Sequence, residues 1–147
     1  MKKSERLKSI AKIAGYRESQ AAREVQEAKL VLDERAMRLS QLQEYYREYA
    51  KKYENQGQAG FNIQQIQNFR KFLHNLQTVI EQQESLVRIA QRFVDDKTQL
   101  WVQARTEVKI YANVITNYQQ EEQHREDNRE QSASDEHAQQ IIRRNKS

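Results

Sequence analysis

The chain has 147 residues, of which 37% are hydrophobic and 31% charged, with three glycines and neither proline nor cysteine. This composition excludes a disulfide framework and a thiolate metal site, and it leaves too few turn-forming residues for a compact globular fold. The net charge is +4, and the basic residues near the ends of the chain do not form a known nucleic-acid-binding motif. The sequence has no run of about 18 apolar residues, the length that a membrane span requires.

In the first third of the chain, apolar residues recur at alternating steps of four and three, the heptad pattern of a coiled coil. Only Glu18 and Arg35 interrupt this stripe. It predicts a first helix over about residues 4–54 whose apolar seam must be covered by another helix. The seam positions are Leu7, Ala11, Ala14, Glu18, Ala21, Val25, Ala28, Leu32, Arg35, Leu39, Leu42, Tyr46, Tyr49 and Tyr53.

The segment NQGQAGFN at residues 55–62 is the strongest turn signal, with two glycines and two asparagines. It separates two helical segments of similar length. A short turn between such helices favours an antiparallel hairpin over helices that pair across two chains. The predicted fold is therefore all-α, with two long helices that form an antiparallel coiled-coil hairpin as a single domain over residues 1–147.

The same heptad test predicts a second helix over about residues 63–120. Only Gln83 and Lys97 interrupt its seam. Beyond this helix, the polar residues up to 147 either continue it and fray or form a tail that orders on a partner. The seam positions are Phe69, Leu73, Leu76, Ile80, Gln83, Val87, Ala90, Val94, Lys97, Trp101, Ala104, Val108, Tyr111, Ile115 and Tyr118.

The pairing register of the two seams has two alternatives. If facing positions sum to 122, Leu32 faces Ala90 and small side chains meet large ones. If they sum to 115, the loop is tighter and Glu18 meets Lys97. The sequence leaves both registers open.

A second apolar stripe flanks the seam of the second helix, at g positions where a two-stranded coiled coil normally carries Glu or Lys. It either widens the core against the first helix or stays exposed as an apolar docking surface. Tyr45 lies beside the seam of the first helix and would extend such a surface. This flanking stripe, broken at Glu107, consists of Phe72, Val79, Leu86, Phe93, Leu100 and Val114.

The sequence contains no motif that binds a phosphate group, a metal ion or a cofactor. Neither GxxxxGK[ST] nor GxGxxG occurs, and His74, His124 and His137 lack the spacing of metal ligands on a helix. Carboxylates on a two-helix structure have no pocket that would desolvate them. We therefore expect no catalytic residues, no cofactor, no metal and no small-molecule substrate.

Two segments beside the predicted turn, LQEYYREY at residues 42–49 and IQNFRKFLHNLQTVIEQQ at residues 66–83, resemble the bacterial flagellar export protein family FliJ. The chain length, Trp101 and DEHAQQ at residues 135–140 agree with this family. The resemblance spans essentially the whole chain without gaps.

The resemblance implies an antiparallel coiled coil similar to the stalk of rotary ATPases, with a role in flagellar type III protein export. Such proteins associate with the hexameric export ATPase FliI and promote its ring assembly and activity. They also contact the membrane export gate protein FlhA and bind export chaperones. The implied location is cytoplasmic, with peripheral association at the inner membrane through the gate and no nucleic-acid partner. The alternatives are the stalk protein of a virulence type III secretion system and a generic homodimeric scaffold.

Carried over residue by residue, the resemblance places an export-gate site near the turn and an ATPase-ring contact at the N-terminus. Phe69 and Leu73 depart conservatively from the family's aromatic-x-x-Phe-Ile pattern, and Arg38 stands where a neutral polar residue is common. The gate-binding residues would be Leu42, Tyr45, Tyr49, Phe72, Leu76, Val79 and Gln83, and the ring contact would be Lys2, Lys3, Arg6 and Lys8.

Overall fold

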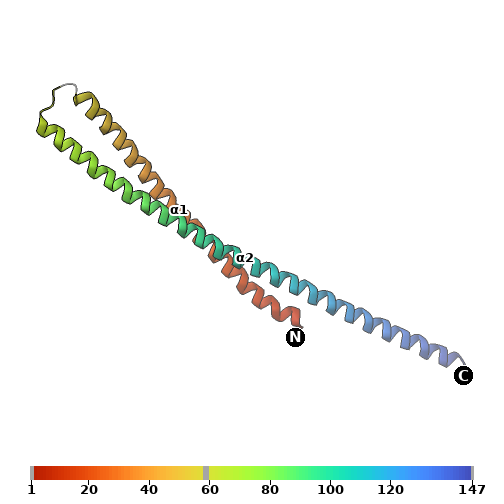
Figure 1. Cartoon of the computed structure of the whole chain (residues 1–147). Helices are drawn as coiled ribbons and strands as arrows, with labels where there is room; N and C mark the ends of the chain where they lie inside the picture. Colours follow the sequence, from red (N-terminus) through yellow and green to blue (C-terminus); the bar gives the residue numbers. More distant parts are fainter. Residues whose placement is uncertain (1, 58–59, 147) are drawn as a thin grey trace. The chain divides into compact units, whose positions relative to one another are not determined.

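Two long α-helices make up the computed structural model of the chain, which describes residues 2–57 and 60–146. Helix α1 spans Lys3–Gly57 and helix α2 spans Ile63–Lys146. The two helices pack against each other in opposite directions (Figure 1). The predicted all-α antiparallel hairpin is confirmed, and the described residues contain no strand.

A capping box determines where α2 begins. Asn62 Oδ1 accepts a hydrogen bond from the N–H of Gln65 at 2.8 Å, and Gln65 Oε1 accepts one from the N–H of Asn62 at 3.2 Å. Gly60 in the connection has φ +94°, which glycine adopts without steric cost. Helix α1 continues to Gly57, into the segment predicted as the turn, and residues 58–59 lie outside the described residues.

The chain divides into two compact units. Unit 1 contains the described parts of Met1–Ser19 and Gln103–Ser147, and unit 2 is Gln20–Val102. Each unit contains a segment of α1 packed against a segment of α2. In unit 1, α2 continues beyond the start of α1, and every side chain from 123 to 145 is exposed. The polar C-terminal segment is therefore a continuing helix that no part of α1 covers.

The core of each unit is the predicted seam. Every seam position in both helices is buried or partly buried, including the polar interruptions. Small side chains at several of the innermost positions let the two backbones approach closely. The most buried apolar residues, with 2% to 8% of their surface exposed, are Ala14 in unit 1 and Val25, Ala28, Ile80, Ala90 and Val94 in unit 2.

Contacts between the helices of unit 2 decide the register. Lys97 Nζ lies 3.4 Å from Glu24 Oε2, and the rings of Tyr53 and Phe69 stack with their centroids 5.3 Å apart. The position numbers of these pairs sum to 121 and 122. The register near 122, which sets small seam residues against large ones, is therefore the one observed, and the alternative sum of 115 does not fit these pairs.

The flanking stripe of α2 faces solvent in unit 2. Its five members there, from Phe72 to Leu100, keep 37% to 51% of their surface exposed. Val114, in unit 1, is partly buried. The five residues of unit 2 therefore form an apolar surface along one edge of the hairpin, and of these Phe72 also packs on Tyr49 of α1.

Candidate protein-binding surfaces

Four aromatic rings form a cluster beside the turn. Tyr49 packs edge-on against Phe72 with the centroids 5.1 Å apart, and Phe69 stacks on Tyr53 at an interplanar angle of 20°. The centroid of Phe69 also lies 6.3 Å from those of Tyr49 and Phe72. Aromatic pairs of this kind each add about 0.5–1.5 kcal/mol beyond area burial. The aromatic cluster therefore holds the turn-proximal ends of both helices together.

Three of the predicted gate-binding residues are exposed at this end of unit 2. Tyr45 extends from α1, and Phe72 and Val79 extend from α2, with 43% to 54% of their surface exposed. All three occupy g positions, and the g positions of two antiparallel helices lie along the same edge of the pair. The hairpin thus presents a surface with an aromatic side chain from each helix.

The other four predicted gate-binding residues belong to the seam. Leu42, Tyr49 and Leu76 are partly buried between the helices. Gln83 Nε2 donates a hydrogen bond to the main-chain carbonyl of Arg35 at 3.0 Å. Replacing any of these four residues would alter the packing of the hairpin itself. Their main role is therefore to hold the two helices together.

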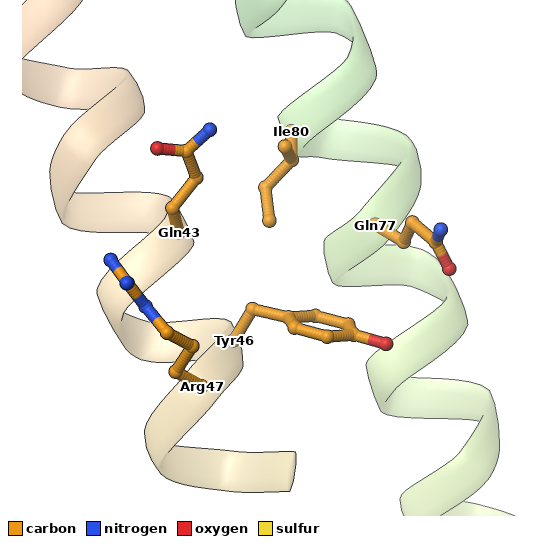
Figure 2. Close-up of a pocket in the computed structure, with 5 residues that line it drawn as sticks. All are labelled: Gln43, Tyr46, Arg47, Gln77 and Ile80. Atoms are coloured by element: carbon orange, nitrogen blue, oxygen red, sulfur yellow. The ribbon is translucent and has the colours of Figure 1, made fainter.

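A groove of about 470 Å³ lies between the helices along the opposite edge. Figure 2 shows Tyr46 and Ile80 pointing from opposite helices into the space between them. Sequence reasoning missed this groove, whose polar lining residues are Gln43 and Gln77 at e positions and Arg47 at a b position. The lining residues are Gln43, Tyr46, Arg47, Gln77 and Ile80.

The residues predicted to contact the ATPase ring lie just before and within the first turns of α1, in unit 1. Lys2, Lys3, Arg6 and Lys8 are all exposed. Lys3 Nζ lies 5.7 Å from the ring centroid of Tyr118 on α2. The four residues therefore add positive charge at this end of unit 1, with Lys8 on the face of α1 opposite Arg6.

Ser4 of α1 and Glu122 of α2 form a polar pair at the end of the seam, beside these basic residues, and sequence reasoning missed it. Ser4, only 3% exposed, donates its hydroxyl to Glu122 Oε2 at 2.8 Å and its N–H to Oε1 at 3.4 Å. The hydroxyl bond, the backbone bond and the charges of Lys2 and Arg125 hold the pKa of Glu122 below its ordinary value, although partial burial opposes them. Continuing the four-and-three steps by one position at each end of the stripe would have found both residues.

We expect Ser4→Ala to return the pKa of Glu122 toward its ordinary value and to speed hydrogen exchange in the first turns of α1. A lowered pKa in the folded state means that the pair stabilises this end above the ordinary pKa. That stabilisation is lost as the pH falls through the lowered pKa. An NMR titration of Glu122, with exchange rates at neutral and acidic pH, measures both effects.

The exposed Ser9 offers a matched control, because Ser9→Ala makes the same chemical change on the same helix. It should leave the titration of Glu122 and the exchange rates unchanged. An unaltered pKa of Glu122 in Ser4→Ala would show that the hydrogen bonds do not control this carboxylate.

Within residues 2–57 and 60–146, no group of three or more His, Cys, Asp or Glu side chains is placed to hold a metal ion. His74, His124 and His137 are exposed. In the same part of the chain, neither helix has a segment both long and apolar enough to cross a membrane.

A family model described as Flagellar FliJ protein matches residues 2–147. The matched range includes both helices, the connection between them and both candidate surfaces. No curated protein and no solved structure matches the chain.

Proposed function

The chain belongs to the flagellar FliJ family and is a component of the flagellar export apparatus, and from that premise we propose that it couples the export ATPase FliI to the export gate protein FlhA. The observation that carries this proposal is the presence of two unlike surfaces in different units. One is polar and basic, and the other is apolar and aromatic. In this function the chain catalyses no reaction, acts as one coiled-coil domain and also binds export chaperones.

The gate-binding role is supported by the exposed edge near the turn. Tyr45, Phe72 and Val79 are large apolar side chains that the hairpin does not bury. Interfaces gain most of their affinity from a few such anchors. Docking on the gate would hold the chain at the cytoplasmic face of the inner membrane without any segment entering the bilayer.

The ATPase-binding role is supported by the basic residues at the start of α1. Exposed Lys and Arg side chains make contacts that tolerate small shifts in geometry, because their charge acts over several ångströms and their stems are flexible. Such contacts suit the interior of a ring, where several similar subunits face one stalk. Lys2, Lys3, Arg6 and Lys8 would supply them.

Adding the purified chain to its cognate FliI tests the proposal. We expect faster ATP hydrolysis and a larger fraction of assembled rings, measured by phosphate release and sedimentation. A variant with its N-terminal basic residues reversed to Glu should lose both effects while keeping its helix content. This variant changes Lys2, Lys3, Arg6 and Lys8.

The matched control reverses four exposed basic residues near the turn and should still stimulate FliI. These are Lys51, Lys52, Arg70 and Lys71. If the unaltered chain changes neither ring assembly nor hydrolysis, the coupling proposal is wrong. If both variants fail equally, net charge and not a local contact drives the stimulation.

A further inference from the structure

One face of α2 in unit 2 carries a row of apolar side chains that α1 does not cover. The members lie three, four or seven residues apart, a spacing that places them on one side of a helix. They keep 37% to 60% of their surface exposed. The exposed row consists of Val79, Leu86, Ile89, Phe93 and Leu100.

The exposed row has nearly the same spacing when it is read from either end. Its four g residues are evenly spaced, and Ile89 lies next to their midpoint, which falls between residues 89 and 90. When a second copy of α2 runs antiparallel across this midpoint, Leu86 lies opposite Phe93 of the second copy. Val79 then lies opposite Leu100, and Ile89 lies beside its own symmetry mate. Such a self-complementary patch is what a twofold contact between identical chains requires.

Charged side chains near the exposed row favour the antiparallel arrangement over a parallel one. A parallel, in-register pair would set Arg92 against Arg92 and Asp96 against Asp96, and like charges in these places repel. The antiparallel pair sets Arg92 opposite residues 86–87 and Asp96 opposite residues 82–83, all of which are uncharged.

The exposed row ends at Phe72 on one side and at a charged residue on the other. At one end, Phe72 packs on Tyr49 within its own hairpin, with the ring centroids 5.1 Å apart. At the other end, the next g position is the charged Glu107. The row therefore meets the predicted gate-binding surface at Phe72 and gives way to charge at Glu107.

The exposed area suits a weak dimer. Five large side chains that are about half exposed offer roughly 100 Å² each, which is roughly 1,000 Å² when two copies meet. Specific interfaces begin at about 1,200 Å² in total, so flanking residues must supply only a small remainder. An apolar patch of about 500 Å² on one chain lies in the upper part of the range for monomers.

We propose that the exposed row is a self-association surface on which a second copy of this chain docks antiparallel about a twofold axis beside Ile89. Self-association requires no export partner, so its test does not depend on whether the proposed coupling function is correct. Val79 also belongs to the gate-binding set, so a paired chain cannot use this residue to contact the gate.

Introduced thiols test the arrangement, because the chain has no cysteine of its own. Ile89→Cys should form a disulfide-linked dimer under mild oxidation, since the two thiols lie beside the axis. Leu100→Cys alone should not, because antiparallel pairing separates the two copies of this position by about 30 Å along the helix. An equimolar mixture of Leu100→Cys and Val79→Cys should cross-link. Leu30→Cys, at an exposed position of α1, should stay monomeric.

Sedimentation equilibrium of the full chain gives a second measurement. We expect the average mass to rise with concentration, and we expect Phe93→Glu to weaken association at least tenfold with unchanged helix content. Leu30→Glu should have no effect. A monomeric mass at every concentration would overturn the proposal. Self-linking of Leu100→Cys, or equal linking of Leu30→Cys, would overturn it as well, since the first indicates parallel pairing and the second random collision.

Discussion

Tyr45→Ala is expected to weaken binding of the chain to the export gate protein FlhA about thirtyfold while leaving its helix content unchanged. Tyr45 is 54% exposed and lies outside the aromatic cluster, so its removal deletes contact surface but spares the seam. Truncating a central aromatic anchor typically costs about 2 kcal/mol or more of binding free energy, which corresponds to about thirtyfold in affinity. Titration calorimetry with the purified gate protein measures the loss.

Phe72→Ala tests the same surface from the other helix. It should lower the affinity by a similar factor, but it should also lower the unfolding midpoint slightly, because Phe72 packs on Tyr49. Tyr16→Ala removes a tyrosine in unit 1 that is 65% exposed, and it should leave gate binding intact. If Tyr45→Ala unfolds the helices, this residue belongs to the core. If Tyr16→Ala lowers the affinity as much as Tyr45→Ala does, the gate site is not confined to the turn-proximal edge.

Val25→Asp is expected to cause the largest loss of stability, about 3–5 kcal/mol in the free energy of unfolding. Val25 is 6% exposed in the seam, where a carboxylate would lose its hydration. Lys97, which faces this position in the observed register, already pairs with Glu24 and would offset only part of that cost. Urea unfolding followed by far-UV circular dichroism measures the change.

Val31→Asp is the matched control, with the same substitution on the same helix at a position that is 42% exposed. Its carboxylate stays hydrated, so the cost should stay below about 1 kcal/mol. Because both variants carry the same change in helix propensity, the difference between their losses of unfolding free energy measures the effect of burial alone. Equal losses would mean that the buried face of α1 is not the predicted seam.

Much of the fold follows from the sequence because the apolar residues recur about every 3.5 positions, close to the roughly 3.6 residues of one helical turn. Once both stripes step by four and three, helix geometry dictates which face is buried. This holds even for Arg35 and Gln83, which are polar and yet partly buried at their seam positions. The exposed g-edge residues were also identified as candidates, because their spacing alone places them beside the seam.

The sequence by itself determined the two helices, the turn between them and the face that each helix buries. The register required the tertiary structure, because the two alternatives differ by one heptad and apolar residues meet apolar residues in both. Particular pairs, such as Lys97 with Glu24, distinguish them. The exposure of the flanking stripe and the closure of the seam by Ser4 and Glu122 were likewise decided only in the tertiary structure. Both depend on how closely two helices approach and where one ends beside the other, which a periodic pattern along a single helix does not specify.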